Sequence, residues 1–180
     1  MKINSLPSLE YLNECFELSE SSPSGLIWKR DEPKGRNGKG KVAGRLKASG
    51  YYVVFILGKE YRTHRIIYSM YHQESVDGKI VDHKDGCSYN NLITNLRIAT
   101  HQENQWNAGV AKNNTSGHKG IRINKLKNNR ASYTAKIRIN GKYIKIGTFR
   151  DFDEAKEKYK QYVDEHLRDF VSTRLEIHSK

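Results

Sequence analysis

Strict alternation of apolar and polar side chains in the carboxy-terminal third is the feature that most constrains this fold. Every second residue from Tyr133 to Ile139 is apolar or aromatic, and the alternation resumes at residues 144–146. The dipeptide Asn140-Gly141 separates the two runs, and Asn-Gly favours the type I′ turn that joins antiparallel strands. Because residues 119–124 alternate in the same way, the pattern predicts a three-stranded antiparallel sheet with one buried face and one solvated face.

A helix is expected to cover the buried face of this sheet. Asp151 and Glu154 have the spacing of a helix amino-terminal cap, and apolar residues follow along one helical stripe. The polar stretch 113–117 precedes the sheet and is the predicted domain boundary. Residues 113–180 are therefore expected to form one domain, in which a three-stranded sheet packs on one helix.

The elements expected upstream are short, and the composition agrees with small cores. Only 36% of the 180 residues are hydrophobic and the mean hydropathy is -0.81, which is too little apolar surface for one large core. The residue patterns predict helices at 8–19, 64–72 and about 100–108, and strands at 26–29, 51–57, 60–63, 80–81 and 96–99. The fold class is therefore α+β, and residues 1–112 are expected to form the first domain, with a small antiparallel sheet.

Positive charge is concentrated in two blocks. The chain has 32 Lys and Arg residues against 20 Asp and Glu residues, a formal net charge of +12. Residues 113–150 hold ten bases and no acid, and residues 23–66 hold eleven bases and three acids. Soluble surfaces usually mix both signs, so this distribution predicts a protein that holds a polyanion in two places.

Several classes of protein are excluded by the same composition. No run approaches the roughly 18 apolar residues that span a membrane, and the amino terminus lacks the apolar core of a signal peptide. Cys15 and Cys87 are the two cysteines, and no Cys-x-x-Cys motif occurs. A disulfide framework and a zinc ribbon are therefore not expected, and a reducing cytoplasm fits the chain.

The residues between 81 and 107 carry the chemistry of a hydrolytic site. Asp82-His83 follows an apolar pair, Asn90-Asn91 lies in a polar loop, and Asn104 lies on the expected helix that begins near Thr100. Carboxylate and amide oxygens are hard ligands that suit Mg²⁺ or Mn²⁺. A histidine beside such an ion can deprotonate water near neutral pH, so these residues supply what phosphodiester hydrolysis requires.

The spacing of these residues resembles a known family. Asp82-His83, Asn95-Leu96-Arg97 and Glu103-Asn104 resemble the motif of the HNH endonucleases, in the phage-type homing branch whose third motif residue is Asn. The resemblance implies a ββα-metal finger over about residues 79–108. It implies that Asp82 and Asn104 are metal ligands, that His83 is the general base, and that Asn95 braces the loop and orients His83. It also implies products with 5′-phosphate and 3′-hydroxyl ends.

Two upstream segments, 25–29 and 63–67, also resemble the segments that precede this module in phage proteins. Within the second of them, His64 is interpreted as a packing or hydrogen-bonding residue rather than a catalytic one. His101 and His118 are interpreted as residues of a helix start and of a linker.

The carboxy-terminal block resembles a second family, the plant ethylene-response-factor (AP-two type) DNA-binding domain. The similarity rests on residues 119–122, 135–138 and 147–149, the last being Gly-Thr-Phe before the final helix. The family's groove-reading tryptophans are absent, and Lys136 stands at an acidic position, so the plant target sequence is not implied. Carried over by position, the DNA-facing residues would be Lys119, Arg122, Asn124, Lys136, Arg138, Tyr143 and Lys145.

Together the residues and the resemblances predict a metal-dependent, site-specific homing-type endonuclease that uses Mg²⁺ or Mn²⁺ to cut double-stranded DNA. We expect a monomer without a membrane partner or a small-molecule cofactor, acting in the cytoplasm, which is the host cytoplasm if a phage encodes it. The amino-terminal basic block is expected to contact the DNA backbone through Arg36, Lys39, Lys41, Arg45 and Lys47.

Two other functions are compatible with parts of this pattern. A DNA-binding transcriptional regulator with an inactive finger would show a broken Asp-His-Asn-Asn set, which the sequence does not. An RNA-binding module would place several aromatic residues on the polar sheet face for base stacking, yet only Tyr143 is expected there.

Overall fold

The computed structural model describes residues 4–31, 38–111, 113–127 and 130–167. The chain divides into two compact units, residues 1–100 and 101–180. Each unit combines helices with small antiparallel sheets, so the α+β class is confirmed. Among the described residues, no helix is both long and apolar enough to cross a membrane.

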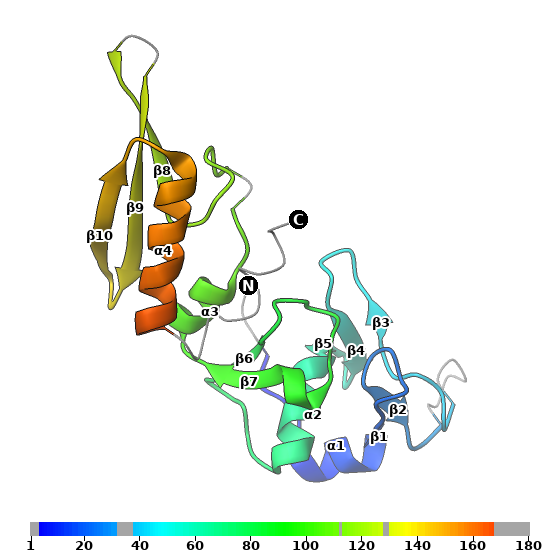
Figure 1. Ribbon diagram of the computed structural model, residues 1–180. Helices are drawn as coiled ribbons and strands as arrows, with labels where there is room; N and C mark the ends of the chain where they lie inside the picture. The colour runs from blue at the N-terminus through cyan, green and yellow to red at the C-terminus, as the bar shows by residue number, and fades with distance from the viewer. Residues whose placement is uncertain (1–3, 32–37, 112, 128–129, 168–180) are drawn as a thin grey trace. The chain divides into compact units, whose positions relative to one another are not determined.

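The first unit consists of short elements in three antiparallel sheets (Figure 1). Strands β1 and β2 form one sheet, β3, β4 and β5 form the second, and β6 and β7 form a hairpin. The elements are α1 (Leu9–Cys15), β1 (Phe16–Leu18), β2 (Leu26–Trp28), β3 (Arg45–Leu46), β4 (Tyr52–Ile56), β5 (Lys59–Arg62), α2 (Thr63–His72), β6 (Ile80–His83), a 3-10 turn (Ile93–Asn95) and β7 (Leu96–Ala99).

Aromatic and aliphatic side chains around α2 form the core of this unit. Phe16 and Trp28 are 1% exposed, and their ring centroids lie 4.8 Å apart across β1 and β2. Ile66 on α2 is fully buried in the same cluster, as is Leu12 on α1. The small sheets therefore pack around one helix, and this places the end of β6 close to the start of α2.

The first predicted helix ends earlier than its periodicity indicated. Helix α1 stops at Cys15, and residues Phe16–Leu18 form strand β1 instead of a continued helix. Phe16 pairs with Trp28 and Leu18 pairs with Leu26 in this sheet. The prediction of a helix to residue 19 was wrong because pairing with a distant strand overrode the local helical pattern.

The second unit contains the predicted sheet and helix. Its elements are α3 (His101–Asn107), β8 (Ile121–Lys125), β9 (Ala131–Ile139), β10 (Lys142–Phe149) and α4 (Phe152–His166). The strand order is β10-β9-β8, and all pairs are antiparallel. Asn140 and Gly141 have φ values of 50° and 77°, which confirms the type I′ turn.

Helix α4 covers one face of the sheet (Figure 1). The Asp151 carboxylate accepts a hydrogen bond of 2.8 Å from the backbone N–H of Glu154, as the cap spacing predicted. Ala135 and Ile137 on β9 pack against Tyr159 and Val163 on α4. The opposite face of the sheet therefore presents the polar residues of the alternation to solvent.

Helix α3 belongs to the second unit. The Trp106 indole N–H donates to the Arg138 carbonyl at 3.0 Å, and the backbone N–H of Asn140 donates to the Gln102 side chain at 2.9 Å. The division after Thr100 therefore precedes α3, whereas the sequence placed the domain boundary after residue 112. Two separately folding domains with that boundary remain a prediction.

Candidate active site

The loop between β6 and β7 is closed by Asn95. Its side-chain amide donates to the Asp85 carboxylate at 2.9 Å and to the Asn90 carbonyl at 2.8 Å. Its side-chain oxygen accepts from the backbone N–H of Asp85 at 3.1 Å. Asn95 therefore braces the loop, as expected from the sequence, but none of these bonds reaches the ring of His83.

The Asp85 carboxylate is the other centre of this loop. It accepts hydrogen bonds from the backbone N–H of Cys87 at 2.7 Å and from the Asn90 amide at 2.8 Å. Burial raises the pKa of Asp85, but these bonds and the one from Asn95 outweigh burial, so its pKa lies below the usual value. The sequence analysis did not assign this residue a role.

His83 is the last residue of β6 and is 4% exposed. Its ring nitrogen Nε2 lies 3.0 Å from the side-chain oxygen of Asn91. The Asn91 amide in turn donates to the Ser24 carbonyl and to the Thr63 hydroxyl oxygen, both at 2.9 Å. The general base predicted from the sequence is therefore held by Asn91 rather than by Asn95.

A second histidine packs against the first. The rings of His64 and His83 meet edge to face with their centroids 4.7 Å apart. Tyr51 lies 5.5 Å from His64 and 6.1 Å from His83 between ring centroids, and the Arg62 guanidinium stands 4.2 Å from the centre of the Tyr51 ring. His64 is 2% exposed, so its position is that of the packing residue the sequence suggested.

Burial keeps both histidines neutral. It is the largest influence on the pKa of His83 and lowers it below 6.5, although the bond to Asn91 and the Asp82 and Asp85 carboxylates act in the opposite direction. Burial is also the largest influence on His64 and lowers its pKa well below 6.5, and the charges of Arg62, Arg65 and a protonated His83 act in the same direction. At neutral pH His83 can therefore accept a proton.

Asp82 precedes His83 and faces Arg97 across the β6–β7 hairpin. The guanidinium atoms Nε and Nη2 lie 3.3 Å and 3.2 Å from Oδ2 of Asp82. The Asp82 side chain is 9% exposed, so this ion pair is well shielded from solvent. The carboxylate is a donor suited to Mg²⁺ or Mn²⁺, and Arg97 offsets part of its charge.

Asn104 lies on α3 in the second unit, and Asp82 lies in the first. The joint role of these two residues as metal ligands therefore remains a prediction. Within the described ranges, no group of three or more His, Cys, Asp or Glu side chains has the arrangement of a metal centre.

The polar face of the second unit's sheet carries several of the residues predicted to contact DNA. Lys136 on β9 is directly opposite Lys145 on β10, and Arg138 is opposite Tyr143. The Lys136 ammonium stands 4.6 Å from the centre of the Tyr143 ring, which is 67% exposed. Like charges placed directly opposite each other repel, so this face favours an anionic partner.

The remaining predicted contacts divide into three groups. Arg122 is exposed on β8, and the Asn124 amide beside it donates to the Thr134 hydroxyl at 2.8 Å. The Lys119 ammonium instead binds carbonyls at the end of α3, those of Gln105, Trp106 and Ala108. In the amino-terminal block Arg36 lies outside the described residues, Lys47 pairs with Glu60, and Lys39, Lys41 and Arg45 are exposed.

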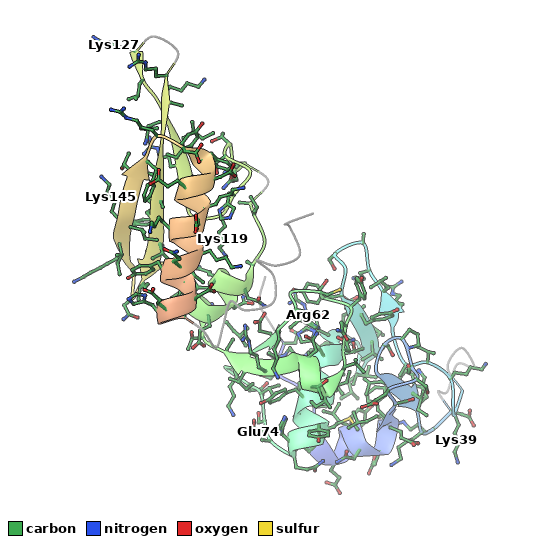
Figure 2. The ribbon with its side chains drawn as sticks, in the orientation of Figure 1. Lys39, Arg62, Glu74, Lys119, Lys127 and Lys145 are labelled. Atoms are coloured by element: carbon green, nitrogen blue, oxygen red, sulfur yellow. The ribbon has the colours of Figure 1, made fainter. Side chains whose placement is uncertain are left out.

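Figure 2 labels cations in each of the two units. Lys145 lies on β10, and Lys127 lies at the end of the hairpin that joins β8 and β9. Lys39 and Arg62 lie in the first unit.

Comparison with known proteins agrees with the geometry of the β6–β7 hairpin and its loop. The model of the HNH endonuclease family matches residues 61–106. The chain carries an HNH endonuclease domain. The matched segment contains Asp82, His83, Asn95 and Asn104, as well as the buried His64.

Three viral proteins are similar to parts of the chain. An uncharacterized HNH endonuclease, L560, of Acanthamoeba polyphaga mimivirus is 34% identical over 128 residues, 71% of this chain and 64% of that protein. The DNA endonuclease I-HmuI of Bacillus phage SP01 is 40% identical over 74 residues, 39% of this chain and 40% of that protein. Protein 3.8 of Escherichia phage T7 is 48% identical over 44 residues, 24% of this chain and 36% of that protein.

The chain thus spans less than two thirds of the length of each of these three relatives. No solved structure matches it significantly. The HNH domain is therefore assigned from the family match and the site geometry.

Sequence reasoning missed two residues of the HNH domain, one that the structure brings to His83 and one that it brings to Asp82. Asn91 belongs to the Asn90-Asn91 pair, which was noted as part of the polar loop without a separate role. Arg97 was noted only as part of a motif, although its position opposite Asp82 follows once the hairpin register is known. Both signals were in the sequence, but only the three-dimensional pairing distinguishes them from ordinary polar residues.

The two buried histidines predict how stability depends on pH. Their pKa values are lower in the folded chain than in the unfolded chain, so the unfolded chain takes up protons first as the pH falls. The free energy of unfolding should be highest above pH ~6.5 and should fall below it, by up to about 1.4 kcal/mol per pH unit for each histidine. Denaturant unfolding of wild type and His64→Gln over a pH series measures this slope.

The matched control is His72→Gln, which removes an exposed histidine from the other end of the same helix. The His72→Gln variant should keep the wild-type slope, whereas His64→Gln should have a shallower one. Identical slopes for wild type and His64→Gln would show that His64 does not resist protonation in the folded protein.

Proposed function

We propose that this protein is a metal-dependent, site-specific DNA endonuclease of the homing type. The observation that carries the proposal is the buried, neutral His83 beside Asp82, at the end of β6 in the segment that matches the HNH family. The substrate would be double-stranded DNA, and the protein would act on it as a monomer. The names of two viral relatives, a DNA endonuclease and an HNH endonuclease, support this substrate class.

In the proposed mechanism His83 is the general base. Its neutral ring takes a proton from a water molecule next to the scissile phosphodiester, and the water oxygen bonds to phosphorus. The bond from phosphorus to the 3′ oxygen breaks, and that oxygen takes up a proton from solvent, which leaves a 3′-hydroxyl and a 5′-phosphate. Asn95 contributes indirectly, because it holds the loop that follows His83.

Asp82 and Asn104 would hold the divalent cation, Mg²⁺ or Mn²⁺. Their carboxylate and amide oxygens are the donors that such hard cations prefer, so the residues fit the ion in kind. When bound, the cation stabilises negative charge on the phosphate and the departing oxygen. Because Arg97 offsets the charge of Asp82, we expect the DNA phosphate to supply much of the remaining affinity for the ion.

The second unit would provide target recognition through the polar face of its sheet. Lys136, Arg138, Tyr143 and Lys145 lie together there, and the face opposite is covered by α4. A three-stranded sheet backed by one helix is also the arrangement implied by the AP-two resemblance, which we retain as a proposal. Residues 23–66 would add phosphate contacts, among them Lys39 and Lys41.

One observation favours a second function. The Asp82 carboxylate is paired with Arg97, whose positive charge opposes the binding of a cation at the same carboxylate. A DNA-binding regulator with an inactive HNH domain would show this arrangement. Plasmid cleavage separates the two functions, because only the endonuclease converts supercoiled DNA to nicked or linear forms in the presence of Mg²⁺.

The first prediction concerns the general base. His83→Ala should lose about 100-fold or more in cleavage rate while its affinity for DNA stays close to that of wild type, because the base acts only in the chemical step. The measurement is supercoiled plasmid cleavage with Mg²⁺, together with an equilibrium binding assay. Near-normal cleavage by His83→Ala from about pH 6 to 9 would remove His83 from the mechanism.

The second prediction concerns the cation. Asp82→Asn and Asn104→Ala should each raise the Mg²⁺ concentration that gives half-maximal cleavage, by about tenfold or more, or abolish cleavage. The matched control is Asp77→Asn, which removes another aspartate that pairs with an arginine, Arg65, at 3.6 Å. Wild-type activity in excess chelator would contradict the metal-dependent mechanism.

The third prediction separates base reading from phosphate binding. Arg138→Ala should reduce discrimination between a cognate site and its point variants by about 1–3 kcal/mol, because an arginine can read a guanine edge through two hydrogen bonds. Lys145→Ala should instead weaken binding to all sequences and lower the salt slope of binding by about one unit. Binding of each full-length variant to matched duplexes over a salt series measures both effects.

Lys158→Ala is the control for this series, because it removes a lysine from α4, which covers the other face of the sheet. It should change neither discrimination nor the salt slope. Unaltered discrimination in Arg138→Ala would move sequence reading to other residues, first among them Arg122.

A further inference from the structure

We propose that Asn91 is the positioning residue that sets the tautomer of His83. Its side-chain oxygen would keep the ring proton on Nε2, so that Nδ1 carries the lone pair that accepts the proton from water. This inference rests on the proposed function and deepens it, because it names the nitrogen through which the general base acts.

The orientation of the Asn91 amide follows from the groups around it. The Ser24 carbonyl can only accept a hydrogen bond, and the Asn91 nitrogen Nδ2 lies 2.9 Å from it. The Thr63 hydroxyl donates to the Tyr52 carbonyl at 3.3 Å, so its oxygen can accept from the same Nδ2, at 2.9 Å. Both protons of the Asn91 amide are therefore used, and Nδ2 faces away from His83.

The Asn91 oxygen Oδ1 then faces the imidazole, 3.0 Å from Nε2 of His83. Because an amide oxygen only accepts, Nε2 must donate, and it must therefore carry a proton. A neutral imidazole has one protonated nitrogen and one with a lone pair, so Nδ1 is the basic atom.

Burial makes this arrangement hard to replace. Asn91 and His83 are 6% and 4% exposed, and Ser24 and Thr63 are fully buried. Turning the amide over would place its oxygen against the Ser24 carbonyl, two acceptors that cannot bond to each other, and solvent has little access to relieve that conflict. The edge-to-face contact with His64 restricts the imidazole from another side.

The structure thus assigns different tasks to two asparagines of one loop. Asn95 bonds to Asp85 and to the Asn90 carbonyl, so it shapes the loop. Asn91 bonds directly to the ring of His83, so it sets the protonation pattern of that ring. A ring in the other tautomer would present an N–H to the water and could not deprotonate it, as in enzymes whose catalytic histidine loses its orienting partner.

The test is nuclear magnetic resonance of the full-length, ¹⁵N-labelled protein. Long-range ¹H–¹⁵N correlations distinguish protonated from unprotonated ring nitrogens, and His83→Gln identifies the His83 signals by their loss. We expect a protonated Nε2 and an unprotonated Nδ1 in the wild type. A wild-type ring protonated at Nδ1 instead would overturn the proposal, and this measurement needs no other variant to fold.

The causal role of Asn91 is tested with Asn91→Leu, which keeps a similar volume and removes the acceptor. The His83 proton should then distribute between both nitrogens. The matched control is Asn90→Ala, which removes the neighbouring asparagine, whose amide donates to Asp85. In this control the His83 proton should stay on Nε2. An unchanged tautomer in a folded Asn91→Leu protein would overturn the role of Asn91.

Cleavage kinetics provide the second readout. Asn91→Leu should lower kcat about 10- to 100-fold with little change in KM for DNA. In the His83→Ala background the same change should have no further effect, because a positioning residue acts only through its partner. Full kcat in Asn91→Leu, or the same loss in both backgrounds, would contradict the proposal.

The two hypotheses fail in different ways. If wild type did not cleave DNA, or if His83→Ala cleaved like wild type, the proposed function would be wrong while the measured tautomer would still stand. If His83→Ala were inactive but the ring were protonated at Nδ1, the endonuclease would stand and the role of Asn91 would be wrong.

Discussion

The buried amide of Asn91 is the hydrogen-bonding junction on which the active-site region of the first unit depends. Its three bonds join segments that are distant in the chain: Ser24 in the turn before β2, Thr63 at the start of α2, and His83 at the end of β6. A buried amide left without partners costs about 1–3 kcal/mol per group, so these segments stabilise one another only when all three are in place. The position of the imidazole is therefore a property of the whole unit rather than of its own strand.

The sequence predicted the parts of both units that depend on local patterns. The β9–β10 hairpin follows from two-residue periodicity and the Asn140-Gly141 turn, and the positions of His83 and Asn95 follow from motif spacing. The contacts of Asn91 could not be predicted in this way, because its partners Ser24 and Thr63 lie 67 and 28 positions away. Strand β1 was missed for a related reason, since its partner Leu26–Trp28 determines its conformation.

In the second unit, the alternation of apolar and polar residues predicted which face of the sheet a side chain lies on, but not all of its contacts. The two-residue periodicity of the strands predicted that Lys136 and Lys145 lie on one face. The structure adds that they are direct cross-strand partners. Alternation could not predict that the Lys119 side chain reaches α3 and binds the carbonyls of Trp106 and Ala108. A long, flexible side chain can bind at a distance from its own strand position, so its partners are set by tertiary structure.

The contacts of the Lys119 ammonium group limit where the chain could be divided by recombination. It satisfies carbonyls at the carboxyl end of α3, where a helix leaves acceptors without intrahelical partners. The segment that matches the HNH family ends at residue 106, inside this helix, while the residue that completes the helix end lies on the far side of the linker. A recombination event at the family boundary would separate the helix from the lysine that binds its end, so an exchanged segment keeps this contact only if it carries the helix and Lys119 together.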